Sequence, residues 1–205
     1  MFTFTIPREA DAKTILEWRI KPRITQFMLT DVEYDLEKQK AWLTSVRSQS
    51  DNMHWIINIS ARKIGLIYLT DINRQDKRCY WGFYVGEDAY LGIGGMIPPY
   101  LYNFVFFEMR METLMGEVLS GNERLIDLHK YHGYRYLECR SKDTIKNGIS
   151  YDVHVMELTR EAWRSKTRFH KYRAVFPLPD AQSHHQGNGL RLGEAFQERR
   201  NGKLP

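Results

Sequence analysis

Cysteines and long apolar runs are both scarce in this chain. Its 205 residues include two cysteines, Cys79 and Cys139, which lack metal-site spacing and fall in predicted strands. We therefore expect both thiols to be reduced and packed inside a cytoplasmic protein. The most apolar window, 100–107, is much shorter than the roughly 20 residues that cross a bilayer. Residues 1–5 lack the charged and apolar regions of a signal peptide, so we expect no membrane contact.

The net charge of +5 is unevenly distributed along the chain. Residues 160–205 contain ten Lys or Arg and four Asp or Glu, a net charge of +6. Residues 1–159 contain 20 basic and 21 acidic residues, a net charge of −1. A nucleic-acid-binding domain would carry positive charge across its fold, so no nucleic-acid partner is expected. Since 42% of the residues are hydrophobic, we expect one domain with a core over 1–159, followed by a basic extension over 160–205.

The extension itself has no single interpretation. Its basic run, 164–173, contains aromatic residues, and residues 190–200 have the composition of a short helix. A solvated tail, a clamp for phosphates and the arm of a homodimer are all open alternatives. His170, His184 and His185 lack the spacing of metal ligands, so no metal site is expected.

Hydrophobic periodicity predicts an α/β (α+β) fold in which a mixed, mostly antiparallel central sheet is flanked by helices. Three consecutive β runs separated by turn residues indicate an antiparallel meander, after which helices and strands alternate. The expected strands are 2–6, 54–59, 63–70, 78–85, 113–119, a strand that begins at 134, and 149–158. The expected helices are 8–19, 35–47, 98–107 and 123–132.

The stretch Tyr90–Met96 is rich in glycine and joins a predicted strand to a predicted helix. That helix is expected to begin near Pro98, because proline is tolerated in a first helical turn. A strand, a glycine turn and a helix form an anion-binding geometry, in which N–H groups at the helix start hold a phosphate. Three glycines in four positions are equally typical of an ordinary turn.

A second motif lies downstream and makes the glycines more informative. Asn122 is a good N-cap for the predicted helix 123–132, His129 follows seven residues later, and Gly133-Tyr134 comes directly after the helix. The order of glycine turn, helix, strand ending in Asn, short helix and Gly-aromatic resembles the GNAT superfamily of acyl-CoA N-acyltransferases.

The resemblance covers most of residues 1–159, with two departures. The first family motif, Gln/Arg-x-x-Gly-x-Gly/Ala, is matched by 89–94, but Ala89 replaces the basic or amide residue. His129 stands where the superfamily usually has a tyrosine. Segments 17–22, 26–28, 39–43 and 64–72 resemble more closely the N-acetyltransferases of pseudaminic acid biosynthesis. Those enzymes acetylate the 4-amino group of a UDP-linked 4-amino-4,6-dideoxy sugar.

The resemblance implies acetyl-CoA as cofactor, bound where the strands beside the glycine turn splay, and a small-molecule nucleotide sugar as acceptor. The implied cofactor contacts are Phe83, Tyr84, Val85, Tyr90, Leu91, Gly92, Ile93, Gly94, Gly95, Met96, Asn122 and Leu128. The implied acceptor contacts are Arg19, Met28, Gln39, Tyr68 and Thr70. For Met28, packing in the core is the alternative.

Acetyl transfer from a thioester requires a neutral amine, stabilisation of the oxyanion and a proton for the thiolate. Glu117 matches the family position of the general base, with a salt-bridged strand glutamate as the alternative. A backbone N–H near 83–85 would polarise the thioester carbonyl. His129 as an imidazolium, with an unperturbed pKa near 6.5, is the expected acid. Tyr131 is a nearby rival, and since two residues turn a helix by roughly 200°, His129 and Tyr131 cannot both face the cofactor.

These features predict an acetyl-CoA-dependent N-acetyltransferase that acts on a UDP-4-amino-4,6-dideoxy sugar. The alternatives are acetylation of a protein N-terminus or another small amine, and a catalytically silent fold that binds acyl-CoA.

Overall fold

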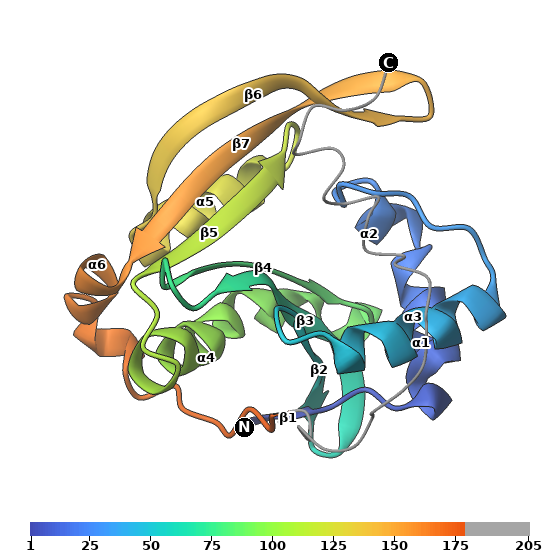
Figure 1. The fold of residues 1–205 in the computed structure, drawn as a ribbon, viewed down its shortest axis with the longest axis horizontal. Coiled ribbons are helices and arrows are strands. Elements are labelled where there is room, and N and C mark those ends of the chain that lie inside the picture. Colours follow the sequence, from blue (N-terminus) through green and yellow to red (C-terminus); the bar gives the residue numbers. More distant parts are fainter. Residues whose placement is uncertain (179–205) are drawn as a thin grey trace.

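A seven-stranded sheet forms the centre of the molecule. The computed structural model describes residues 1–178 (Figure 1). The strand order is β1-β2-β3-β4-β5-β7-β6, and all neighbouring strands are antiparallel except β4 and β5. The strands are β1 Phe2–Thr5, β2 Met53–Ile59, β3 Arg62–Asn73, β4 Arg78–Val85, β5 Thr113–Leu119, β6 Arg135–Lys146 and β7 Ile149–Thr159. The expected mixed α/β fold with a mostly antiparallel sheet is confirmed.

Two tight turns set the register of the hairpins. Ser60 and Ala61, between β2 and β3, have φ of 47° and 63°, and Asn147 and Gly148, between β6 and β7, have 49° and 77°. Two consecutive positive φ angles are typical of two-residue hairpin loops, whose twist matches that of the strands. The β6–β7 hairpin extends from the sheet as a curved arm (Figure 1).

One face of the sheet is covered by three helices near the N-terminus. These are α1 Ala12–Arg19, α2 Pro22–Thr25 and α3 Leu36–Ser48, and Asp35 caps α3 by accepting a hydrogen bond from Lys38 N–H at 3.0 Å. Apolar side chains of the helices pack on sheet residues in a second buried cluster: Ala12, Ile15, Trp18, Ile24, Leu43, Ile56, Leu66 and Tyr84. We call this side of the sheet the acceptor face.

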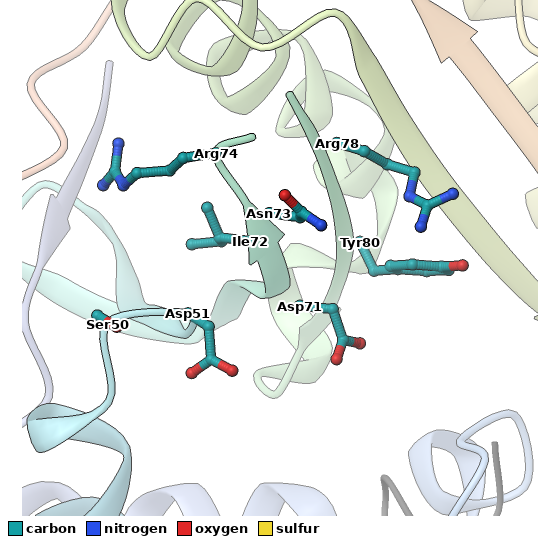
Figure 2. Close-up of a pocket in the computed structure, with 8 residues that line it drawn as sticks. All are labelled: Ser50, Asp51, Asp71, Ile72, Asn73, Arg74, Arg78 and Tyr80. Carbon is teal, nitrogen blue, oxygen red and sulfur yellow. The ribbon is translucent and has the colours of Figure 1, made fainter. Parts of the chain in front are cut away.

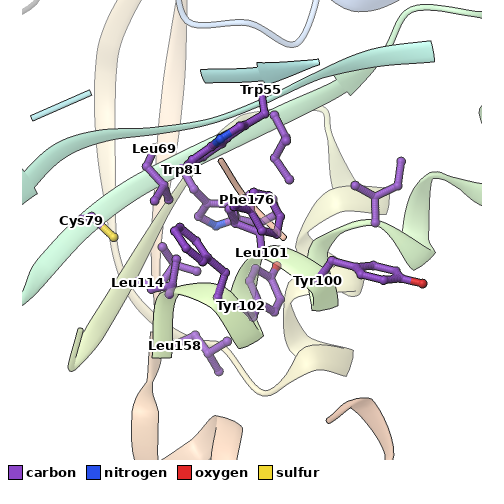
Figure 3. Close-up of a cluster of buried hydrophobic side chains, with 14 of the residues drawn as sticks. Trp55, Leu69, Cys79, Trp81, Tyr100, Leu101, Tyr102, Leu114, Leu158 and Phe176 are labelled. Atoms are coloured by element: carbon purple, nitrogen blue, oxygen red, sulfur yellow. The ribbon is translucent and has the colours of Figure 1, made fainter. Parts of the chain in front are cut away.

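The opposite face carries α4 Pro98–Asn103, which continues as a π-helical turn over Phe104–Glu108, and α5 Glu123–His132. The expected helix 98–107 is therefore present, with a looser last turn. Gly133 ends α5 in the left-handed conformation, with φ of 100°, as expected. The main hydrophobic core lies between this face and α4, with Trp55, Trp81, Tyr102 and Leu114 at its centre (Figure 3).

The boundary expected at residue 159/160 does not divide the fold. Helix α6, Arg160–Arg164, and the following segment place Trp163, Phe169 and Phe176 in the main core with exposed fractions of 0%, 8% and 3%. Buried Asn103 ties this segment down, because its Nδ2 donates to the carbonyls of Phe169 and Tyr172 at 2.9 and 2.7 Å. Residues 160–178 therefore belong to the domain. The expectations for His184, His185 and residues 190–200 lie outside the described part of the chain.

The two cysteines differ in their surroundings. Cys79 is fully buried in the main core, as expected. Cys139 is exposed, so the expectation that it is packed is wrong. It lies on β6, an edge strand with no neighbour beyond it in the described sheet. Over residues 1–178, no helix has the length and apolar character needed to cross a membrane.

Candidate active site

The parallel strands β4 and β5 separate after three residue pairs. The paired residues are Arg78 with Thr113, Cys79 with Leu114 and Tyr80 with Met115. Beyond these, in the part of the chain that the structure describes, β4 pairs only with β3 and β5 only with β7. A wedge therefore opens between residues 81–85 of β4 and 116–119 of β5. The splay implied by the family resemblance is confirmed.

The glycine-rich stretch follows β4 and differs in form from the expected turn. Asp88–Met96 is a 3₁₀ helix of nine residues. Part of its backbone is engaged locally, since Ile97 N–H donates to the Gly94 carbonyl at 3.1 Å. The open glycine turn expected here is therefore wrong in its local conformation, because the segment continues as helical backbone into α4.

Nothing inside the fold requires glycine at the three positions of this segment. None of them has a positive φ. A Cβ on Gly92 would meet no atom within 4 Å, one on Gly94 would lie 3.5 Å from Val85 Cγ2, and one on Gly95 would lie 3.6 Å from Leu128 Cδ1. Those are ordinary van der Waals distances. Because glycine has no Cβ, a ligand can come close to the backbone here, which suits a phosphate-bearing cofactor.

The same contacts place several expected cofactor residues around the wedge. The Gly94 position lies against Val85 and Phe83 of β4, and the Gly95 position lies against Leu128 of α5. The segment thus connects the strand on one side with the helix on the other. Tyr90 and Ile93 are half-buried against the main core.

Two apolar side chains of this region are exposed, and the polar side chain at the start of α5 makes no capping hydrogen bond. The exposed fractions of Leu91 and Met96 are 43% and 49%, which leaves apolar surface for an organic ligand. Asn122 is the N-cap of α5, as expected, but its side chain makes no capping hydrogen bond. The side chain of Tyr84 packs in the cluster on the acceptor face, so only its backbone faces the wedge.

Glu117 lies on β5 just past the point where the strands separate. It follows Met115, the last residue paired with β4, by two positions, so both side chains point to the same face of the sheet. Its side chain is 12% exposed, and Oε1 accepts a hydrogen bond from Arg140 Nη2 at 2.5 Å. A carboxylate so placed can accept a proton from a group bound on the acceptor face.

His129 does not fit the role of an imidazolium acid. Its ring is 2% exposed and packs against Trp81 and Tyr134, with ring centroids 5.7 and 4.3 Å away. Burial, followed by the nearby His132, lowers the pKa of His129 to about 3. The ring is therefore neutral near pH 7, because burial would deprive the charged form of its hydration. This neutral ring disagrees with the expectation that His129 donates a proton as an imidazolium.

Tyr131 turns away from His129, as the helical geometry requires. Its ring is 54% exposed and lies under the guanidinium of Arg168, 4.5 Å from the ring centroid. It also contacts Phe169 in the C-terminal segment, with centroids 5.8 Å apart. Tyr131 therefore belongs to the surface that α5 shares with residues 167–169.

Three expected residues come together on the acceptor face. Arg19 is 8% exposed and donates to Thr25 Oγ1 at 3.3 Å and to Thr30 Oγ1 at 3.1 Å. Burial raises the pKa of the Tyr68 phenol, while Arg19 lowers it and Glu117 raises it. Tyr68 thus lies within electrostatic reach of Arg19 of α1 and Glu117 of β5.

The remaining expected acceptor residues are less closely joined. Thr70 lies two residues after Tyr68 on the same face of β3, opposite Tyr80. Met28 is half-buried against the acceptor-face cluster. Gln39 is buried on α3.

The β6–β7 arm closes over this face at its tip. Lys146, at the end of β6, is 6% exposed, donates to the Thr25 carbonyl and lies 3.2 Å from Asp31 Oδ1. Thr25 Oγ1 also donates to Asp31 at 3.2 Å. The arm and the segment after α2 are therefore joined beside Arg19. The sequence indicated neither this contact nor Arg140, because both depend on how the hairpin folds over the sheet.

A cavity of about 450 Å³ lies at the end of the β3–β4 hairpin. Figure 2 shows Arg78 and Tyr80 extending from β4 on the same side as Asp71. The cavity adjoins the acceptor face, because Tyr80 opposes Thr70 in the ladder. It is lined by Ser50, Asp51, Asp71, Ile72, Asn73, Arg74, Arg78 and Tyr80. In residues 1–178, no group of three or more His, Cys, Asp and Glu side chains is arranged to hold a metal ion.

Strands that split beside a glycine segment, with a carboxylate just past the split, are the features of an acyl-CoA-dependent transferase. Residues 4–155 match the acetyltransferase (GNAT) domain family, and the chain belongs to that family. It is an acetyltransferase that uses acetyl-CoA.

Among individual proteins, the chain is similar to two curated relatives named Acetyltransferase PseH from Campylobacter jejuni. With the serotype O:2 protein it shares 24% identity over 124 residues, which is 60% of this chain and 76% of that protein. With the serotype O:23/36 protein it shares 24% over 131 residues, 64% and 81% of the two chains. Among solved structures, spermidine N-acetyltransferase from Vibrio cholerae in complex with CoA and spermine has a TM-score of 0.71 at 14% identity, covering 80% of this chain and 98% of that one.

Proposed function

We propose that this protein transfers the acetyl group of acetyl-CoA to the 4-amino group of a UDP-linked 4-amino-4,6-dideoxy sugar, as in pseudaminic acid biosynthesis. The observation that carries the proposal is Glu117, which lies just past the β4–β5 split on the same face of the sheet as Tyr68. The similarity to proteins named Acetyltransferase PseH supports the acceptor class.

In this proposal, residues 83–96 bind the cofactor and the acceptor face presents the amine. The cofactor supplies the acetyl group as a thioester. Glu117 accepts a proton from the amine nitrogen as the C–N bond forms and the C–S bond breaks, the departing thiolate takes one proton from solvent, and Glu117 returns its own to solvent. Backbone N–H groups on the β4 edge left unpaired by the split stabilise the oxyanion. This assignment needs no charged His129.

Arginine side chains beside the acceptor face are suited to the phosphates of an anionic acceptor. Buried Arg19 and Lys146 border this face, and Arg78 lines the adjoining cavity. The side chains of Arg74 and Arg78 make no hydrogen bond or ion pair recorded within residues 1–178. Guanidinium groups are suited to phosphate oxygens, so the cavity can hold the distal part of a nucleotide sugar. The likeness to the spermidine enzyme is one of fold, at 14% identity.

Competing acceptors test this function directly. Purified protein and acetyl-CoA are incubated with the UDP-4-amino sugar, with spermidine or with a peptide that has a free N-terminus, and both thiol release and product mass are measured. We expect kcat/KM for the nucleotide sugar to exceed that for spermidine by at least roughly 100-fold, since buried polar groups discriminate strongly between acceptors.

Two results would contradict the proposal. Preferred turnover of spermidine or of the peptide would assign the chain to another small-amine or N-terminal acetyltransferase. Thermal stabilisation by acetyl-CoA without acetylation of any acceptor would assign it to the silent acyl-CoA binders. Stabilisation by UDP alone is expected for the nucleotide-sugar enzyme, because a ligand that binds the folded state raises its stability.

A further inference from the structure

Arg140 reaches Glu117 across an intervening strand. The sheet order places β7 between β5 and β6, and Val155 of β7 pairs with both Glu117 and Glu138. Arg140 lies two residues after Glu138 on β6, on the same face of the sheet. Its Nη2 nevertheless lies 2.5 Å from Glu117 Oε1. The side chain therefore spans β7 above a short apolar residue that leaves it room.

The guanidinium is held from its own strand as well. Its Nε lies 3.4 Å from Glu138 Oε1 and its Nη1 lies 3.5 Å from Asp143 Oδ2. The ladder shifts register between Arg140 and Thr144, and such a bulge redirects side chains. Arg140 is 31% exposed and Glu117 is 12% exposed, so the pair is partly withdrawn from water. On β6 the group has an ion pair with Glu138 that is not a hydrogen bond and a long hydrogen bond to Asp143, so its short hydrogen bond is the one to Glu117.

We propose that Arg140 is a positioning residue for acetyl transfer, which fixes the carboxylate of Glu117 in the orientation that accepts the amine proton. The inference rests on the proposed role of Glu117 as general base. A general base must lie within roughly 2.6–3.2 Å of the atom that loses the proton. A glutamate side chain has three rotatable bonds, and a charge-assisted hydrogen bond restricts them. Arg140 thus acts on the reaction through Glu117 and does not touch the acceptor.

A second arginine–glutamate pair, which joins β6 to its neighbour β7, provides a control. Arg135 of β6 is paired with Glu157 of β7, but Arg135 is 71% exposed. Glu157 pairs with Met115, before the separation of β4 and β5, so this ion pair lies outside the wedge. Arg135→Gln therefore removes an ion pair from the same hairpin and leaves the contact between Arg140 and Glu117 in place.

A double-mutant cycle on kcat tests the inference. Glu117→Gln is expected to lower kcat by roughly 10²–10⁴-fold. Arg140→Gln alone is expected to lower it by about 10- to 100-fold, because a misplaced base loses alignment. The double variant should be no slower than Glu117→Gln, since Arg140 has nothing left to position. Arg140→Lys should recover part of the activity, KM values should stay near wild type, and Arg135→Gln should match wild type in both backgrounds.

Three outcomes would overturn the inference. Equal fold-losses from Arg140→Gln with and without Glu117 would show that Arg140 acts independently. A raised acceptor KM with unchanged kcat would make it a binding residue. If Glu117→Gln itself kept wild-type kcat, the general-base role would fail, whatever Arg140 does. Circular dichroism and thermal melts of each variant check folding, and the lysine variant retains the test if the glutamine variant unfolds.

Discussion

His129 illustrates how the surroundings of a residue determine its chemistry. The position in the motif suggested a proton donor, but the ring is enclosed by Trp81, Tyr134 and the backbone at Gly116, where an added Cβ would lie 3.1 Å from His129 Nε2. Neither ring nitrogen has a hydrogen-bond partner within the described residues. A buried imidazole without a partner avoids the charged form, so its effect appears in stability.

We predict that His129→Phe flattens the acid dependence of stability. The pKa of His129 is about 3 in the folded protein and near 6.5 when unfolded. Between these values the unfolded state binds more protons, so this contribution is fully present above about pH 6.5 and is lost as the pH falls, by up to about 1.4 kcal/mol per unit. Urea unfolding at about pH 7 and about pH 5 measures it.

The same variant separates the structural role from the catalytic one. The pH dependence of kcat should be unchanged in His129→Phe, because a neutral buried ring supplies no titrating acid near pH 7. Loss of the alkaline limb of kcat would restore His129 as the proton donor. An unchanged pH slope of stability would contradict its burial as a neutral ring.

At the scale of elements, the C-terminal segment differs most from expectation. Its basic composition suggested a tail, yet its aromatic side chains complete the main core. Trp163 Nε1 donates to Asn103 Oδ1 at 2.9 Å, and Trp55 Nε1 donates to the Pro177 carbonyl at 2.8 Å. The lysines and arginines lie between these anchors. A count of charges did not reveal the anchors, because their partners lie far away in the sequence.

We predict that Trp163→Ala destabilises the protein by about 3–5 kcal/mol, the usual cost of removing a buried tryptophan. The exposed fraction of Trp163 is 0%, and the change also leaves Asn103 without one partner. Val175→Ala is the control in the same segment, since Val175 is 81% exposed and should shift stability by less than about 0.5 kcal/mol. Urea unfolding measures the free energy of unfolding of both variants. Equal losses in the two variants would contradict the assignment of this segment to the core.

At the scale of the whole molecule, local signals in the sequence predicted most elements and their order. Proline at the start of α4, Asp35 at α3 and Gly133 after α5 act on their own neighbours, so their effects are visible in the sequence. The splay of the strands beside the glycine segment followed from the family resemblance, whereas the parallel pairing of β4 with β5 was not predicted, since parallel pairing leaves no local signal.

The candidate site was predictable only in part for the same reason. Arg19, Tyr68 and Glu117 were expected, and the fold brings them within electrostatic reach of one another. Arg140 and Lys146 were missed, because their contacts depend on the register and curvature of the β6–β7 arm. The cofactor and acceptor assignments of individual residues stay predictions, as does a homodimer.

Titration of acetyl-CoA into Gly94→Val tests the central claim, that the wedge and the glycine segment together form the cofactor site. A Cβ at Gly94 would lie in ordinary contact, 3.5 Å from Val85 Cγ2, so we expect the variant to fold, with a modest loss of stability. The added side chain occupies the space that the pyrophosphate needs. Calorimetry should therefore show affinity weakened by at least roughly 100-fold, or about 2.7 kcal/mol. Unchanged affinity in a folded Gly94→Val protein would contradict the account.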